Sequence, residues 1–238
     1  MKIIPIKTKV FHINDNLKDF LIQTFAKNKL RENDIICITS KVISIAENQL
    51  VKKSSQPNKE KLIKKEADFY FGKGAFDCHL TIKHNILIPS AGIDESNSEL
   101  DNYILYPKRP FKSAKKLLTF LKKKFNIKKL GIIITDSHTT PLRRGVTGIS
   151  LSHWGFRGVE SLVGKKDIFG RAFKYTYVNH ADALASTAVY QMGESNETIP
   201  IVLLRGIHLH WTNRDVSQDC IIPLKEDIYL PILIKTKK

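Results

Sequence analysis

The chain has 238 residues, of which 42% are hydrophobic and 26% are charged, so it can bury a sizeable core and is not a disordered or fibrous protein. Its formal net charge of +16 favours anionic partners such as nucleotides, nucleic acids or membrane surfaces. Three isolated cysteines exclude a disulfide framework and a four-cysteine zinc site, and no stretch approaches the ~20 apolar residues of a membrane span. Because a signal-peptide core is also lacking at the start, we expect a cytoplasmic protein.

The first half of the chain is predicted to alternate strands and helices. Continuous or alternating runs of Ile and Val indicate strands, and amphipathic spacing after a capping residue indicates helices. Residues 34–39 are continuously apolar, which is typical of a strand buried on both faces. The expected strands are residues 2–11, 34–39 and 80–89, and the expected helices are residues 17–26 and 59–71, with a glycine-rich loop at 72–74.

The second half follows the same pattern. We expect helices over residues 113–125 and 179–190, strands over 130–135 and 201–204, and a loop-and-strand region over 141–156. No internal repeat or low-complexity linker interrupts the chain. Residues 1–238 are therefore predicted to form a single unit, or two closely packed subdomains with the site between them.

Two aspartates follow predicted strands. Asp94 lies in a polar loop after residues 80–89, and Asp136 comes directly after residues 130–135. Carboxylates at strand ends are well placed to bind a hard divalent cation. A single aspartate after a strand more often caps a turn, so the prediction of a metal site depends on the pair.

Several basic residues could bind an oxyanion. Lys41 follows the strand at 34–39, and Arg143 with Arg144 precedes a glycine in the 141–156 region. No glycine-rich loop ends in Lys-Ser or Lys-Thr, which argues against a P-loop nucleotide site. His208 and His210 have no evident third ligand nearby, and Cys37 lies inside an apolar strand, so we assign none of these three a catalytic role.

The lysine-rich runs at residues 59–65, 112–129 and 235–238 allow a different function. A basic protein of this size can bind nucleic acid through such runs. Neither a zinc-finger spacing nor an RNA-binding aromatic stripe accompanies them, and solvated helix faces usually have this composition. Nucleic-acid binding is therefore retained as the alternative of another class.

Four motifs occur in one order and spacing: Thr39-Ser40-Lys41, the loop from Ser90 to Asn97, Thr135-Asp136-Ser137 followed by residues 141–148, and Met192-Gly193-Glu194. In this respect the chain resembles the gamma-glutamyl ligase family typified by coenzyme F420-0:L-glutamate ligase. The resemblance extends from the Ile-Pro-Ile start to Arg205-Gly206. Several motifs in register are far more specific than any one alone.

The resemblance implies an α+β fold of mixed, largely antiparallel sheets with flanking helices, the F420-0 gamma-glutamyl ligase-like fold, in an intertwined homodimer. It implies GTP or ATP as co-substrate and two Mg²⁺ or Mn²⁺ ions, with K⁺ as a further candidate cation. Asp94, Asp136 and Arg143 would be catalytic. The metal ligands would be Asp94, Asp136, Ser137 and Glu194. The nucleotide would contact Ile4, Pro5, Ile6, Ser40, Lys41, Asn97, Met192, Gly193, Ser195 and Asn196.

One segment departs from the F420 enzymes. Where they typically have Phe-Gly-Arg-Pro-Trp-Arg, this chain has His138-Thr-Thr-Pro-Leu-Arg143, which keeps the proline and the final arginine and loses the aromatic and glycine positions. This version resembles a subgroup thought to act in folate metabolism. Our main prediction is therefore ligation of L-glutamate to a folate or pteroate through an acyl phosphate, with F420-0 as the alternative acceptor.

Overall fold

The computed structural model describes residues 1–56 and 58–235, and it centres on a five-stranded sheet. The strand order is β1 (Lys2–Ile6), β12 (Ile201–Arg205), β2 (Asp34–Thr39), β8 (Leu130–Thr139) and β9 (Val146–Trp154). Only β2 and β8 run parallel, and the other neighbours are antiparallel. The expected α+β class with mixed, largely antiparallel sheets and flanking helices is confirmed.

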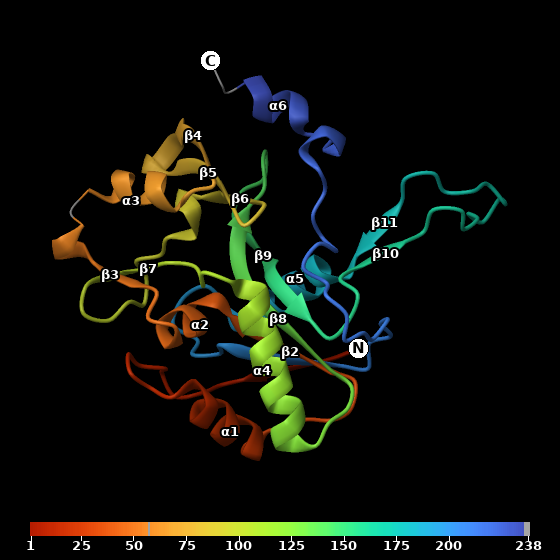
Figure 1. The fold of residues 1–238 in the computed structure, drawn as a ribbon, viewed down its shortest axis with the longest axis horizontal. Helices are drawn as coiled ribbons and strands as arrows, with labels where there is room; N and C mark the ends of the chain where they lie inside the picture. The colour runs from red at the N-terminus through yellow and green to blue at the C-terminus, as the bar shows by residue number, and fades with distance from the viewer. Residues whose placement is uncertain (57, 236–238) are drawn as a thin grey trace.

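Helices cover both faces of this sheet, which explains why its central strands are continuously apolar. Figure 1 shows α4 (Pro110–Phe125) in front of the sheet and α5 (His180–Met192) behind it, with α1 (Leu17–Lys27) and α2 (Ser40–Ala46) on the side of α4. In β2, Ile36 and Ile38 pack in the core beneath α1, α2 and α4. Ile35 and Cys37 point to the opposite face and pack in the core beneath α5. Cys37 is thus a buried core residue, as its position in the sequence predicted.

A second, smaller group of elements lies beside the main sheet. It contains α3 (Lys59–Glu66) and a three-stranded antiparallel sheet of β4 (Phe69–Lys73), β5 (His79–Lys83) and β6 (Ile86–Pro89). Leu62, Ile63, Ala91, Ile93 and Tyr103 form its core. The pair β3 (Leu50–Lys52) and β7 (Asn102–Ile104) connects this group to the main sheet (Figure 1).

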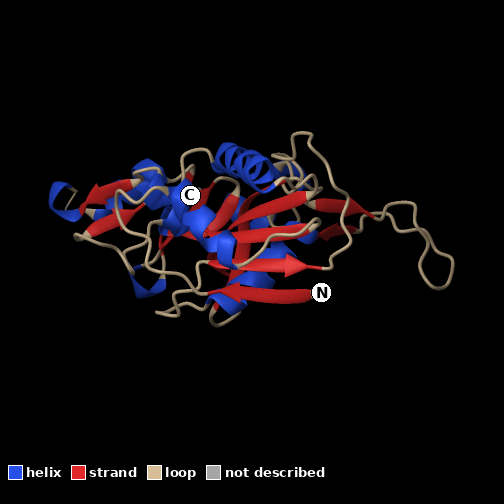
Figure 2. Cartoon of the chain, turned by 90° about the horizontal axis from the view of Figure 1, so that it is seen from below, coloured by secondary structure: helices blue, strands red, loops and turns tan. Residues whose placement is uncertain are grey.

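The remaining elements are short. The hairpin of β10 (Val159–Ser161) and β11 (Tyr177–Asn179) projects from the body as an arm over residues 159–179, which both views show clearly (Figures 1 and 2). Single turns occur at η1 (Lys53–Ser55), η2 (Ala75–Asp77), η3 (Ser90–Gly92) and η4 (Leu224–Glu226), and the described chain ends in α6 (Leu230–Lys235). None of the helices in the described part of the chain is both long and apolar enough to cross a bilayer.

Four expectations about the elements were wrong. The strand expected over residues 2–11 ends at Ile6, where its pairing with β12 ends. The helix expected over residues 59–71 ends at Glu66, and residues 69–73 form β4. The single strand expected over residues 80–89 is the hairpin β5–β6, whose turn residues His84 and Asn85 have φ values of 52° and 61°. The strand expected to end at residue 135 continues to residue 139 as β8, because residues 135–139 pair with β9. Asp136 therefore lies inside a strand rather than after one.

Candidate active site

Residues from five distant segments line one cavity of about 480 Å³. The segments are residues 8–11 after β1, the β2–α2 junction, the loop after η3, the outer half of β8, and the end of α5 with the loop that follows it. Of the residues predicted for the site, the lining includes Lys41, Asp94, Asn97, Asp136, Ser137, Met192, Gly193, Glu194 and Asn196. The fold therefore places together acidic side chains that are far apart in the sequence.

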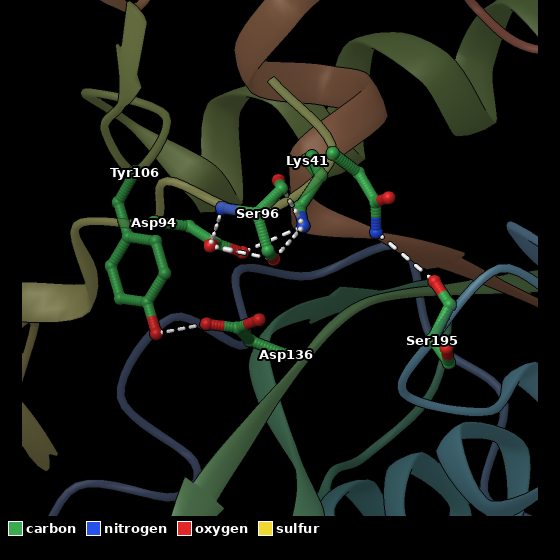
Figure 3. Close-up of polar contacts among 7 residues, drawn as sticks. Lys41, Asp94, Ser96, Tyr106, Asp136 and Ser195 are labelled. Atoms are coloured by element: carbon green, nitrogen blue, oxygen red, sulfur yellow. Dashed lines mark hydrogen bonds and ion pairs between the residues drawn. The ribbon is translucent and has the colours of Figure 1, made fainter.

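The carboxylate of Asp94 is held by Lys41 and Ser96. Lys41 Nζ lies 2.6 Å from Asp94 Oδ2, while the backbone N–H and the hydroxyl of Ser96 donate to Asp94 Oδ1 at 2.7 and 2.8 Å (Figure 3). Partial burial alone would raise the pKa of Asp94, but the Lys41 ammonium and the Ser96 donors hold that pKa below its usual value. Asp94 is therefore an anion with one cation already against it.

Asp136 is held from the other side by Tyr106. The buried Tyr106 hydroxyl donates to Asp136 Oδ2 (Figure 3). Burial raises the pKa of Asp136 to about 6, in opposition to the lowering effect of the Tyr106 hydroxyl and the Ser137 N–H. The negative charge of Asp94 raises it further, so the two carboxylates are near enough to interact electrostatically.

The close approach of Tyr106 to the loop after β6 depends on Gly92. Gly92 has a φ of +69°, and a Cβ at this position would lie 2.2 Å from Tyr106 Cζ. The Tyr106 ring also stacks on His84, with 6.3 Å between ring centroids. A glycine and a stacked ring thus fix the phenol that orients Asp136.

Glu194 provides the third carboxylate, from the loop that follows α5. Burial raises the pKa of Glu194, and the charges of Asp94 and Glu197 act in the same direction. The Ser137 hydroxyl and the Lys41 ammonium act in the opposite direction and lower that pKa. Glu194 therefore lies close to groups from both β8 and α2.

The two loops on either side of the cavity are joined by one hydrogen bond. Asn97 Nδ2 donates to the backbone oxygen of Ser195 at 3.0 Å (Figure 3). The loop after α5 is itself compact, because the Ser195 N–H donates to Glu197 Oε2 and Gly193, at φ +77°, leaves room for the Glu197 carboxylate. This bond ties the loop after η3 to the loop after α5, and both loops line the cavity.

The oxygen ligands in the cavity are of the kind that Mg²⁺ and Mn²⁺ prefer. Asp94, Asp136 and Glu194 line the same cavity, and the charge of Asp94 raises the pKa values of the other two. Among residues 1–56 and 58–235, however, no three His, Cys, Asp or Glu side chains are gathered closely enough to surround one ion as they lie. The ligand types fit a divalent cation, and Asp94, Asp136, Ser137 and Glu194 are the residues that would hold it.

Comparison with known proteins gives the family. The model of the F420-0:Gamma-glutamyl ligase family matches residues 5–206. The chain belongs to this family. It is 32% identical to a coenzyme F420:L-glutamate ligase of Methanococcus maripaludis over 91% of this chain and 93% of the relative. It is 31% identical to the protein of that name from Methanocaldococcus jannaschii over 96% of each chain, and 31% identical to that of Methanosarcina mazei over 84% of each chain.

The membership confirms the resemblance seen in the sequence motifs and the prediction of an enzyme. This protein is a ligase that forms a gamma-glutamyl bond, as the description of its family states. The comparisons give no support to a folate acceptor, which was our main prediction, and they favour the alternative, F420-0.

Some of the residues predicted for the ligase site lie outside the cavity lining. Ile4, Pro5 and Ile6 are in β1, and the residues that follow them, 8–11, line the cavity instead. Ser40 is buried at the start of α2, and Ser195 contributes its backbone oxygen to the Asn97 bridge. Arg143 lies in the exposed turn between β8 and β9, away from the cavity lining.

The sequence reasoning missed several residues of the ligase cavity. Thr39 and Thr135 both line it and are partners in the parallel pairing of β2 with β8. The sequence could have indicated their place in the cavity, because each threonine follows a buried apolar run of a predicted strand. Tyr106 carried no such signal, because its role depends on the turn at Gly92 that brings the ring to Asp136.

Proposed function

We propose that this ligase uses a nucleoside triphosphate to join L-glutamate to an F420-0-type acceptor. The names of its relatives support this acceptor, and they replace the folate acceptor as our leading hypothesis. The observation that carries the proposal is the convergence of Asp94, Asp136 and Glu194 with Lys41 in one cavity. Such a set of charges suits a triphosphate bound through divalent cations.

The proposed reaction begins with phosphoryl transfer. A carboxylate oxygen of the acceptor attacks the terminal phosphorus of the nucleotide, the bond to the bridging oxygen breaks, and the nucleoside diphosphate leaves. The product is an acyl phosphate. The amine of glutamate then attacks the acyl carbon, inorganic phosphate leaves, and the amine loses a proton to give the amide. Activation is needed because a free carboxylate is a poor electrophile.

The residues of the chain have distinct roles in this proposal. Lys41 would exchange Asp94 for a phosphate oxygen and reduce the repulsion between the anionic acceptor and the anionic phosphate. Asp94, Asp136, Glu194 and the Ser137 hydroxyl would hold two Mg²⁺ or Mn²⁺ ions. When bound, these ions would neutralise phosphate charge and orient the transferring group. Asn97 would keep the two loops closed over the nucleotide.

We also propose that two copies of the chain associate through the arm at residues 159–179. Ile168, Phe169 and Tyr175 in the arm are 93%, 75% and 86% exposed. A two-stranded hairpin is marginally stable alone, and exposed apolar side chains favour burial against a protein surface. This supports the homodimer expected from the sequence resemblance.

The test is a reconstituted reaction. The purified protein is incubated with F420-0, L-glutamate, MgCl₂ or MnCl₂, and ATP or GTP, and products are identified by mass spectrometry. We expect the acceptor to gain one glutamyl unit with stoichiometric release of phosphate. A parallel incubation with dihydropteroate tests the folate acceptor.

Two variants make the test specific. Asp94→Asn should abolish product formation, whereas Asp77→Asn, at an exposed aspartate that pairs with Lys73, should not change it. No glutamyl product with either acceptor would contradict the proposal. Tight, steeply salt-dependent binding of RNA or DNA without nucleotide hydrolysis would support the nucleic-acid alternative instead.

A further inference from the structure

A second cavity, of about 240 Å³, lies at the start of α4. Three segments form it: the β5–β6 turn, the residues that enter α4, and a stretch of the C-terminal region. Its lining residues are His84, Asn85, Lys108, Arg109, Pro110, Phe111, Lys112, Ser217, Gln218 and Ile221. None of them belongs to the candidate active site or to the motifs that identify the family.

The lining of this cavity is basic and contains no acidic residue. Within the described residues, the charged groups of Lys108, Arg109 and Lys112 have neither an ion pair nor a hydrogen-bond partner. Carboxylates on neighbouring elements have partners of their own. Asp68 accepts the His84 N–H and lies near Lys83, and Glu47 accepts the Ser113 hydroxyl. In the C-terminal stretch, Asp215 accepts the Ser217 N–H and Asp219 pairs with Arg157. None of the three cavity cations is therefore paired directly with a carboxylate of the described residues.

The backbone at this position adds to the positive potential. Arg109 occupies the N-cap of α4 without making a side-chain cap, and the first turn contains no acidic residue. The N–H groups of Phe111 and Lys112 lack acceptors within the helix because they belong to its first turn. A helix start usually has a carboxylate or hydroxyl in this place, so the site is complementary to an anion from outside the chain.

We propose that this cavity binds one phosphoryl group of a small molecule. A phosphate carries close to two negative charges and three terminal oxygens, which match two lysines and the planar fork of an arginine. Sites for whole drug-sized ligands are about 300–1,000 Å³, so a 240 Å³ cavity suits a phosphoryl group with a short attached segment rather than a nucleotide.

The cavity is linked to the active site by two aromatic rings. His84 lines the cavity and stacks on Tyr106, whose hydroxyl holds Asp136. A phosphoryl group bound here has two sources: a phosphorylated portion of the glutamate acceptor, or a separate phosphorylated molecule that changes the activity. The first source rests on the proposed ligase function, and the second does not.

Binding is tested with inorganic phosphate, measured by isothermal titration calorimetry on the metal-free protein. The variant Arg109→Gln/Lys112→Gln removes two cavity charges. The matched control Lys116→Gln/Lys123→Gln removes two exposed charges from the same helix outside the cavity. We expect the phosphate Kd to rise about tenfold or more in the cavity variant, because two charge-assisted contacts are lost, and to change little in the control.

A third variant, Lys41→Met, separates this cavity from the active site. Phosphate binding that survives Lys41→Met and fails in the cavity variant supports the proposal, whether or not ligase activity is found. Binding that is lost in Lys41→Met and retained in the cavity variant belongs to the active site and overturns it. Equal Kd values for the wild type and the cavity variant, or no phosphate binding by the wild type, also overturn it.

Steady-state kinetics then distinguish the two sources. If the phosphoryl group is part of the acceptor, the cavity variant raises the KM for the acceptor, leaves the KM for the nucleotide unchanged, and phosphate inhibits competitively with the acceptor. If the ligand is a separate molecule, both KM values are unchanged and phosphate alters kcat in the wild type and the control but not in the cavity variant.

Discussion

Replacement of Tyr106 by Phe tests whether the phenol orients the carboxylate of Asp136. The substitution removes one hydroxyl and retains the ring that stacks on His84 and packs over Gly92. A hydrogen bond to a charged group contributes about 1.5–3 kcal/mol, which corresponds to a factor of roughly 10–100 in an equilibrium constant. Removal of a residue that orients a metal ligand typically lowers metal affinity by about the same factor.

We therefore expect Tyr106→Phe to weaken Mn²⁺ binding about 10- to 100-fold, measured by electron paramagnetic resonance of free Mn²⁺ in the absence of nucleotide. The matched control is Tyr103→Phe, which removes the hydroxyl of another buried tyrosine from the same segment of chain. Thermal unfolding checks that both variants remain folded. Wild-type Mn²⁺ affinity in folded Tyr106→Phe would show that the hydroxyl does not orient a metal ligand.

Of three further predictions, the first concerns the contact between Tyr106 and Asp136, and the other two concern the stability of the fold. Gly92→Ala should displace the Tyr106 ring, so it should lower Mn²⁺ affinity in the same direction, and combining it with Tyr106→Phe should be clearly less than additive. Arg205→Leu should lower the free energy of unfolding in urea by about 3 kcal/mol, because the buried Asp34 carboxylate loses two hydrogen bonds of 2.7 Å. Adding Asp34→Asn to this variant should recover part of the loss. No recovery would refute the explanation. Burial lowers the pKa of His153 to about 4, so the folded state excludes a proton that the unfolded chain binds below pH 6.5. About 3 kcal/mol of stability that is present above pH 6.5 should therefore be lost as the pH falls to 4. If His153 is the group responsible, His153→Phe should make stability nearly independent of pH between 6.5 and 4.

The sequence predicted those elements in which local signals and burial agree. The strand over residues 34–39 was predicted with its observed bounds, because a continuous apolar run between polar residues suits a strand covered on both faces. Asn16 and Asn179 cap α1 and α5, and each helix starts directly after its cap. These features depend on neighbouring residues alone, so one sequence suffices to find them.

The errors occurred where a contact distant in the sequence decides the structure. No element was predicted over residues 40–46, and they form α2, which contacts β2 and β8. The β5–β6 turn uses His84 and Asn85, which lack the glycine that usually marks a two-residue hairpin. Asp136 lies inside β8 because β9 extends the pairing, which no pattern within residues 130–139 could reveal.

The candidate site was predictable as a set of residues but not as a geometry. The motifs identified the three carboxylates and Lys41, and the fold places them around one cavity. The sequence could not show that Tyr106 contacts Asp136, or that Arg143 lies on an exposed turn, since both depend on how the β8–β9 hairpin and the loop after β6 are placed.

The projecting arm offers trypsin a cluster of exposed cleavage sites, whose fragments are told by their masses from those of cuts elsewhere. Lys165, Lys166, Arg171 and Lys174 are exposed within it, and trypsin cleaves after such residues. Cleavage of one peptide bond there would leave the five-stranded sheet and its cavity intact. It would cut the chain within the apolar tip that we propose to mediate association. Brief digestion, read by gel, can therefore report whether the arm is covered in a given preparation before any activity is measured.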